Sequence, residues 1–140
     1  MIKREDQGLH RELIVAVDRN GAIGSNGDLG FSCKEDMAWF KWYTMGKTLL
    51  CGKNTYPGIA NLPGRTVQLI KRGEYPEGCY VGGGQVYNSV IGIVDRAVVT
   101  HLNTEIEDAD TFFDIGLLEQ FSKSTIVRNE EWGRIVIYER

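Results

Sequence analysis

The hydrophobic pattern alternates short apolar runs with amphipathic or glycine-rich segments. Leu13 to Val17 is a continuous apolar run, typical of a strand buried on both faces of a mixed or parallel sheet. Further strands are expected at residues 48–51, 66–70, 79–81 and 97–101. Two more apolar segments, 124–128 and 134–138, flank a polar stretch and predict an antiparallel hairpin that closes the sheet edge.

Helix signals lie between these runs. Ser32-Cys-Lys-Glu35 matches a capping box and Gly46 supplies a stop, so a helix is predicted over about 33–45. One face of this helix combines an acid with apolar residues. The positions on that face are Asp36, Met37, Phe40 and Thr44.

Shorter helices are expected at 53–59, where Pro57 and Gly58 limit the length, and at about 85–93. Strands alternating with helices predict the α/β class, a single domain with a mixed, mostly parallel sheet flanked by helices. The C-terminal hairpin adds the antiparallel part. Residues 1–10 could form a flexible N-terminal extension.

Between the first strand and the first helix, residues 18–31 hold four glycines in fourteen residues. This glycine content is too high for regular structure and predicts a mobile loop. Loops of this length are usually functional or disordered. The loop is therefore a candidate for a segment that closes over a ligand.

Composition fits an ordinary soluble domain, with 140 residues, 42% of them hydrophobic and 25% charged. The net charge of -3 disfavours broad binding to nucleic acid or anionic membranes. Three cysteines without CxxC spacing favour reduced thiols in a cytosol, and the two distant histidines favour no metal site. The charged start and the absence of a long apolar run lead us to expect a cytoplasmic protein. We expect neither nucleic acid nor a membrane as partner, and we expect a monomer.

Two strand-to-helix turns carry glycine, at Gly52–Thr55 and at Gly82–Tyr87. Each turn alone is more often only a tight connection, but two of them at strand ends make a dinucleotide site plausible. Lys71 and Arg72 follow the third strand and could meet a further anion such as a 2′-phosphate, although they could equally be a solvated strand end. No nucleophile–base set appears in the sequence, which favours a borrowed cofactor.

Asp36 has two interpretations. An acid on an apolar helix face can be a satisfied core polar group or a helix cap. Its position directly after the glycine-rich loop would instead place a partly desolvated carboxylate in a crevice that can close over a ligand. This position favours a role in substrate recognition.

Taken in order along the chain, a set of motifs resembles the dihydrofolate reductase family. These motifs are Ala16-Val17-Asp18-Arg19, Ile23-Gly24, Asp36-Met37-Ala38-Trp39-Phe40-Lys41, Thr44, Gly52-Lys53-Asn54-Thr55-Tyr56, Leu62-Pro63-Gly64-Arg65, Gly82-Gly83-Gly84-Gln85-Val86-Tyr87, Thr100-His101 and Asp110-Thr111. The resemblance implies NADPH-dependent reduction of 7,8-dihydrofolate, with hydride transfer to pterin C6 and protonation at N5. It also implies binding of antifolates.

The same resemblance assigns residue roles. It implies that Asp36 grips the pterin ring and is catalytic together with Leu29 and Phe31, that Arg65 holds the glutamate α-carboxylate, and that Asp110 bonds to the glycine-rich loop. The implied substrate contacts are Ala16, Asp36, Met37, Phe40, Ile59, Arg65, Val81 and Thr100. The implied cofactor contacts are Ala16, Ile23, Gly24, Gly52, Lys53, Asn54, Thr55, Ile70, Lys71, Arg72, Gly83, Gly84, Gln85, Val86 and Tyr87.

The chain departs from the family pattern at two places. Gly30-Phe31 stands where the family usually has Pro-Trp, and only about fifteen residues separate Arg65 from Val81, where the family commonly carries another strand and helix. Two alternatives stay open at this point. One is an NADPH-dependent pyrimidine reductase of riboflavin synthesis, and the other is a non-catalytic module that binds a pterin or a nucleotide.

Overall fold

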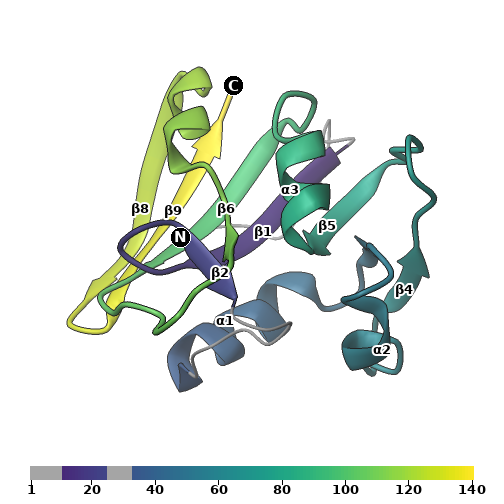
Figure 1. Cartoon of the computed structure of the whole chain (residues 1–140), viewed down its shortest axis with the longest axis horizontal. Coiled ribbons are helices and arrows are strands. Elements are labelled where there is room, and N and C mark those ends of the chain that lie inside the picture. The colour runs from purple at the N-terminus through teal and green to yellow at the C-terminus, as the bar shows by residue number, and fades with distance from the viewer. Residues whose placement is uncertain (1–10, 25–32) are drawn as a thin grey trace.

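A seven-stranded sheet forms the centre of the molecule in a computed structural model that describes residues 11–24 and 33–140 (Figure 1). Its strand order is β4-β3-β5-β1-β6-β9-β8. The strands are β1 (Arg11–Val17), β3 (Thr48–Cys51), β4 (Thr66–Leu69), β5 (Gly78–Gly82), β6 (Arg96–Leu102), β8 (Lys123–Glu130) and β9 (Gly133–Glu139). A separate pair is β2 (Ala22–Gly24) with β7 (Thr111–Phe112). The helices are α1 (Lys34–Thr44), α2 (Tyr56–Ile59), α3 (Gly84–Val90) and the 3-10 helix η1 (Ile115–Gln120).

The sheet is mixed and mostly parallel, as the sequence predicts. β4, β3, β5, β1 and β6 run parallel to one another, whereas β9 is antiparallel to β6 and forms an antiparallel hairpin with β8. The carboxyl ends of the five parallel strands therefore meet at one edge of the sheet. In open α/β sheets this edge is where ligands bind.

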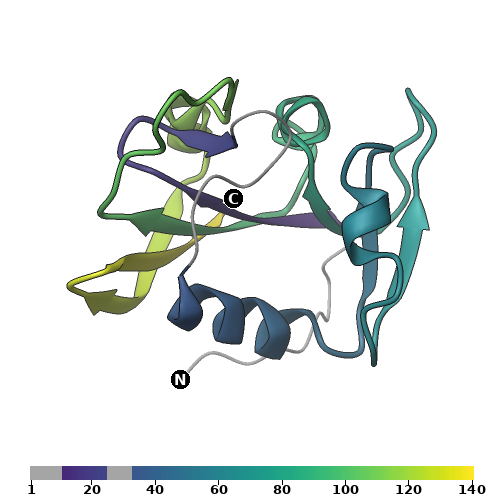
Figure 2. The same ribbon diagram turned by 60° about the horizontal axis from the view of Figure 1, so that its bottom comes forward.

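Helices cover both faces of the sheet. α1 lies across one face, and α3 lies on the opposite face (Figure 2). Side chains alternate along β1, so that Ile14 packs on the α1 face while Leu13 and Val15 pack on the α3 face. The first strand is consequently buried on both sides, which explains its continuous apolar run.

The segment after β1 is more ordered at its start than the glycine pattern predicts. Asp18 is only 3% exposed, and its carboxylate accepts hydrogen bonds from the backbone N–H groups of Asn20 (2.7 Å), Ala22 (2.8 Å) and Ile106 (2.7 Å). β2 then pairs with β7. The loop prediction is therefore wrong for residues 22–24, which form β2, while residues 18–21 form a turn without regular structure. Residues 25–31 of that predicted loop lie outside the described part of the chain.

Gly21 is needed for this arrangement. Its φ is +83°, and a Cβ there would lie 2.6 Å from the Phe113 carbonyl oxygen. The Phe113 N–H donates to the Gly21 carbonyl oxygen at 2.8 Å. Glycine thus lets the β1–β2 turn contact the chain next to β7, rather than making the turn mobile.

α1 begins slightly later than predicted. Cys33 occupies the N-cap position, and its side chain makes no capping bond to the described helix backbone. The predicted cap, Ser32, lies outside the described residues. At the other end Met45 is the C-cap and Gly46 has a φ of +81°, which confirms the predicted stop.

The described residues contain no helix that is long and apolar enough to cross a membrane. No disulfide joins any two of Cys33, Cys51 and Cys79, all of which lie in the described residues. The thiols of Cys51 and Cys79 are buried in the sheet.

Replacing Asp18 by alanine should lower the free energy of unfolding by about 2–4 kcal/mol, because buried N–H groups would lose their acceptor. Asp114→Ala is the matched control, since Asp114 is exposed and accepts one bond, from the Gly116 N–H at 3.0 Å. The control should cost about 0.5–1 kcal/mol. Urea unfolding followed by circular dichroism measures both, and equal losses would contradict the anchoring role of Asp18.

Candidate active site

Asp36 and Thr100 form the polar centre of the candidate site. Asp36 lies in the first turn of α1, and Thr100 lies in the second half of β6 and is 1% exposed. The Thr100 hydroxyl donates a hydrogen bond of 2.6 Å to Asp36 Oδ1. Burial raises the pKa of Asp36, and the hydrogen bond from Thr100 acts in the opposite direction by favouring the ionised form. Asp36 is therefore a partly desolvated acid held by a neutral donor.

Ala16 lies next to this pair. It is the register partner of Thr100 across β1 and β6, and it is half-buried although the residues on either side of it are buried. Ala16 is therefore a place where β1 has an open surface. The sequence predicts Ala16, Asp36 and Thr100 to belong together, and the strand register and the Thr100 bond bring them together.

Three further predicted substrate contacts lie on the same face of the sheet. Val81 is 9% exposed near the carboxyl end of β5, and Phe40 and Ile59 are half-buried against the apolar cluster on the α1 face. Met37 differs, because it is 64% exposed. The prediction that Met37 shares a buried face with Asp36 is wrong, since neighbouring residues of a helix point about 100° apart. Its proposed contact with substrate stays a prediction.

Arg65 lies at the opposite end of α1 from Asp36. Its Nε donates to the Pro63 carbonyl at 3.0 Å, and its Nη1 donates to the Thr44 hydroxyl at 3.3 Å. Asp36 and Thr44 are eight residues apart, which corresponds to about 12 Å along a helix. The helix therefore presents a carboxylate and a guanidinium at its two ends, a spacing suited to an elongated ligand with a polar ring and an anionic tail.

The two glycine turns meet at the carboxyl edge of the sheet. The Gly52 N–H donates to the Gly82 carbonyl at 2.9 Å, and a Cβ on Gly52 would lie 3.2 Å from Val86 Cγ2. A Cβ on Gly82 would lie 2.9 Å from Thr55 Oγ1, and the Gly82–Gly83 peptide is cis. Glycine therefore allows the close packing of this junction, while Lys53 and Asn54 are exposed beside it.

The start of α3 completes the predicted cofactor side. A Cβ on Gly84 would lie 2.6 Å from Thr111 Cγ2 and 3.6 Å from Ile23 Cδ1, so the β2–β7 pair packs directly over this turn. Gly24 is the last residue of β2. Gln85 at the beginning of α3 is exposed.

Lys71 and Arg72 are exposed just after β4, in a turn where the Glu74 N–H donates to the Lys71 carbonyl at 3.0 Å. The Ile70 N–H donates to the Cys51 carbonyl at 3.0 Å, which places this turn next to the end of β3. The basic pair and the Gly52 turn consequently share one corner of the molecule.

The separation of β1 from β5 is a feature that sequence reasoning missed. Their register pairs end at Leu13 and Tyr80, whereas β1 stays paired with β6 as far as Val17. The Tyr87 hydroxyl donates to the Ile14 carbonyl oxygen at 2.7 Å, and burial raises the pKa of Tyr87. The two central strands thus part toward their carboxyl ends, between the Asp36 pair and the glycine turns.

Some predicted residues are not placed. Leu29, Phe31 and the Gly30-Phe31 departure lie outside the described residues. Asp110 accepts a bond from the Thr111 hydroxyl at 2.9 Å, and its predicted bond to the glycine-rich loop stays a prediction.

Comparisons of the sequence with known proteins match one family. A sequence model of the family "Dihydrofolate reductase" matches residues 11–80. The dihydrofolate reductase of Haemophilus influenzae is 28% identical over 123 residues, which cover 72% of this chain and 76% of that protein. The dihydrofolate reductase of Mycobacterium tuberculosis is 31% identical over 113 residues, covering 65% of this chain and 70% of that protein.

A solved structure has the same fold. It is the dihydrofolate reductase from Enterococcus faecalis complexed with NADP(H) and RAB-propyl, with a TM-score of 0.72 and 23% sequence identity. The match covers 94% of this chain and 96% of that chain. At this identity the likeness supports the fold alone, and the arrangement of the sheet and helices follows it.

Thr100→Val should raise the pKa of Asp36 further, because the variant keeps the shape of the side chain but removes the hydrogen bond that favours the carboxylate. The carboxyl ¹³C shift of Asp36, followed by NMR across pH, measures the change. Thr111→Val is the control, since that hydroxyl donates to Asp110 and not to Asp36. A pKa of Asp36 that stayed the same or fell in Thr100→Val would contradict the assigned interaction.

Proposed function

Because this chain belongs to the dihydrofolate reductase family, we propose that the Asp36–Thr100 pair is the centre of its active site. The protein is an NADPH-dependent oxidoreductase that reduces 7,8-dihydrofolate to 5,6,7,8-tetrahydrofolate, and the family binds dihydrofolate and antifolates. The observation that carries the assignment is a partly buried acid, fixed by a threonine, beside the point where β1 and β5 separate. The two alternatives, a pyrimidine reductase and a non-catalytic module, lose their support with the family match.

The residues at the carboxyl edge fit a dinucleotide. Glycine lets the Gly52 and Gly82 turns pack closely against Val86 and Thr55, and the parting of β1 from β5 opens the sheet next to them. Gly52–Thr55 and Gly83–Tyr87 would hold the pyrophosphate and nicotinamide, with Lys71 and Arg72 at the 2′-phosphate. When bound, NADPH supplies the hydride for pterin C6.

Asp36 binds and orients the pterin. Its carboxylate accepts hydrogen bonds from the N3–H and 2-amino groups of the ring, and the Thr100 hydroxyl fixes the carboxylate by holding Oδ1. The negative charge of Asp36 favours protonation of N5, because the two groups share a partly desolvated site. Ala16, Phe40, Ile59 and Val81 supply apolar surface that excludes water from the ring.

Arg65 binds the far end of the substrate. Its guanidinium is held by Pro63 and Thr44, and a guanidinium in a fixed orientation suits the glutamate α-carboxylate of dihydrofolate. The substrate would then extend along α1 from Asp36 to Arg65. This role of Arg65 is the basis for the last inference below.

We also propose a monomer in the cytoplasm, built as one domain. The exposed edge strand β8 has a register irregularity between Ile126 and Arg128 and carries charged side chains, features that protect an edge from pairing with a second copy. Three cysteines that form no disulfide with one another suit a reducing compartment. The net charge of -3 gives no support for nucleic acid as a partner.

Asp36→Asn tests the catalytic assignment, because it keeps the size of the side chain and removes its charge. Oxidation of NADPH with 7,8-dihydrofolate should be measurable in the wild type. Hydride transfer at neutral pH in the variant should fall by a factor on the order of 10²–10⁴, since N5 would no longer be favoured to protonate. Lower pH should restore part of the rate, because acid supplies dihydrofolate that is already protonated.

Single-turnover rates across pH decide this prediction. A variant that folds like the wild type and transfers hydride at the wild-type rate at pH 7 would remove Asp36 from the mechanism. A wild type that does not oxidise NADPH with dihydrofolate would overturn the proposed function itself.

Replacing Lys71 and Arg72 together by alanine should narrow the preference for NADPH over NADH by at least about tenfold, because each charge-assisted contact to a phosphate contributes about 1.5–3 kcal/mol. The control is the double variant Lys123→Ala, Arg128→Ala, which removes the same charge from β8 at the other edge of the sheet. The kcat/KM ratio for the two cofactors measures the effect. Equal ratios in the two double variants would show that the 2′-phosphate is recognised elsewhere.

A further inference from the structure

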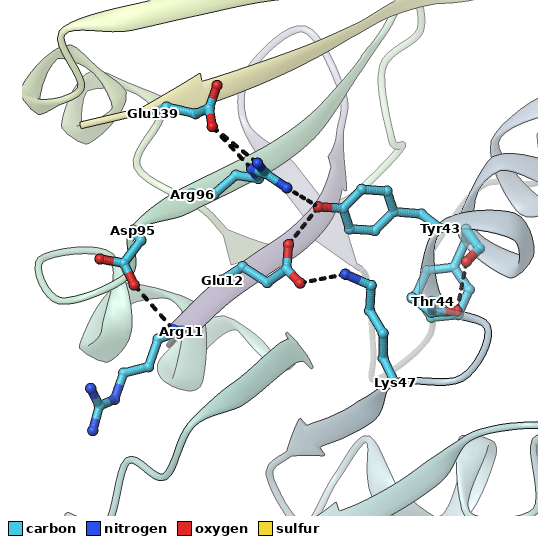
Figure 3. Close-up of polar contacts among 9 residues, drawn as sticks. Arg11, Glu12, Tyr43, Thr44, Lys47, Asp95, Arg96 and Glu139 are labelled. Atoms are coloured by element: carbon cyan, nitrogen blue, oxygen red, sulfur yellow. Dashed lines mark hydrogen bonds and ion pairs between the residues drawn. The ribbon is translucent and has the colours of Figure 1, made fainter. Parts of the chain in front are cut away.

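A buried carboxylate lies at the end of the sheet opposite to Asp36. Glu12, the second residue of β1, is 4% exposed. It accepts hydrogen bonds from the Tyr43 hydroxyl at 2.5 Å and from Lys47 Nζ at 2.7 Å (Figure 3). Burial raises the pKa of Tyr43, and Glu12 acts in the same direction, so the phenol stays protonated and remains a donor.

The two donors to Glu12 stand on either side of Thr44. Tyr43 precedes it at the end of α1, and Lys47 follows three residues later. The Lys47 N–H donates to the Thr44 carbonyl at 3.0 Å. Glu12 therefore holds the last turn of α1 and the residues after it from two points.

The same segment is bonded to the chain that carries Arg65. The Lys47 carbonyl accepts from the Thr66 N–H at 3.1 Å, and the Gly46 N–H donates to the Gly64 carbonyl at 2.8 Å. The residues on both sides of Arg65 are thus tied to the segment that Glu12 holds. In addition, Arg65 Nη1 donates to the Thr44 hydroxyl at 3.3 Å, and that hydroxyl donates to the Phe40 carbonyl at 2.6 Å.

The network continues into the sheet on the other side. Arg96 on β6 donates to the Tyr43 hydroxyl at 3.1 Å, and its guanidinium pairs with Glu139 on β9 at 3.1 Å (Figure 3). Apolar packing of α1 on the sheet is not directional, whereas these bonds define where the end of the helix lies. A buried ion pair is weak support for stability alone, which makes a positional role the more informative one to test.

We propose that Glu12 is a positioning residue for Arg65, acting through Tyr43, Thr44 and Lys47 to hold the guanidinium where it binds the glutamate tail of dihydrofolate. The proposal rests on the proposed function, because it takes Arg65 as the tail-binding residue. Glu12 itself does not touch the substrate. Its influence is therefore expected on binding of the tail and not on the chemical step.

Steady-state kinetics with two substrates tests the inference. 7,8-Dihydrofolate carries the glutamate tail, and 7,8-dihydropteroate lacks that tail and ends in a benzoate carboxylate closer to the pterin. Glu12→Gln should raise KM for dihydrofolate by on the order of tenfold, the effect of losing about one charge-assisted contact, and should leave kcat within about twofold. KM for dihydropteroate should stay near the wild-type value.

Three variants serve as references. Glu130→Gln makes the same chemical change at an exposed ion pair on β8, where Glu130 contacts Arg128 at 2.8 Å outside this network, and should not alter KM for either substrate. Arg65→Lys should show the tail-specific rise in KM directly. In the double variant Glu12→Gln, Arg65→Lys the two effects should be less than additive, because both changes disturb one contact.

The outcomes separate this inference from the proposed function. A lack of tail-specific change in Arg65→Lys would remove Arg65 from tail binding and overturn the premise. A tail-specific change in Arg65→Lys without one in Glu12→Gln, or an equal rise in KM for both substrates in Glu12→Gln, would overturn the positioning role alone.

Tyr43→Phe keeps the test decisive if Glu12→Gln does not fold. It removes only the hydroxyl, and the ring still packs on Trp39, with centroids 5.5 Å apart in the wild type. A smaller rise in KM confined to dihydrofolate supports the inference. Unchanged KM for dihydrofolate in a folded Tyr43→Phe contradicts it.

Discussion

The hydrogen bonds at the two ends of α1 are the constraint on which the rest of the site depends. At the first turn Thr100 bonds to Asp36, and at the last turn Glu12 bonds to Tyr43. Much of the helix surface between them is exposed, and Tyr43 and Thr44 are its only buried residues in the described structure. Apolar contact holds such a helix against the sheet but leaves it free to slide or rotate. The directional bonds remove that freedom, and they fix the pterin-binding and tail-binding ends relative to each other.

Both bonds reach the helix from strands that run side by side. Thr100 lies on β6 near its carboxyl end, and Glu12 lies on β1 near its amino end. β1 and β6 are paired over six positions. This pairing fixes Glu12 and Thr100 relative to each other, and through them it fixes the two ends of α1. The sheet thus acts as a rigid frame on the β6 side. On the β5 side β1 loses its partner after Leu13, and this is where the cofactor turns gather.

Much of the fold could be predicted from local sequence, because its elements are long enough to carry a periodic signal. The strand at 48–51 has the predicted bounds, and the C-terminal hairpin is antiparallel as expected. β2 and β7 could not be found in this way, since they are very short and their pairing joins Ala22 to Phe112. α3 ends at Val90, whereas the sequence predicts a helix to about residue 93. The apolar pattern continues past Val90, but the backbone forms a turn at residues 91–93.

In the site, too, features with a local sequence signal could be predicted and long-range contacts could not. Asp36 and the glycine turns were identifiable because each breaks a local pattern, an acid on an apolar face or a cluster of glycines at a strand end. The bond from Thr100 to Asp36 spans 64 positions, and the bond from Tyr43 to Glu12 spans 31. Nothing in a short window of sequence reports such a pairing. The Glu12 network was missed for this reason, since Glu12 read locally is one polar residue before an apolar strand.

Because the connection from β4 to β5 is short, the corner that carries Lys71 and Arg72 is more exposed to water than the surroundings of Asp36. In the described residues 70–77 no helix forms, and three of the four side chains of the edge strand β4 are exposed. Lys71 and Arg72 are therefore in contact with water, so recognition of an anion at this corner depends on charges that solvent screens. Such interactions weaken as salt is added. Asp36 is partly buried against Thr100 and is screened less, so ionic strength should affect cofactor binding more than orientation of the pterin.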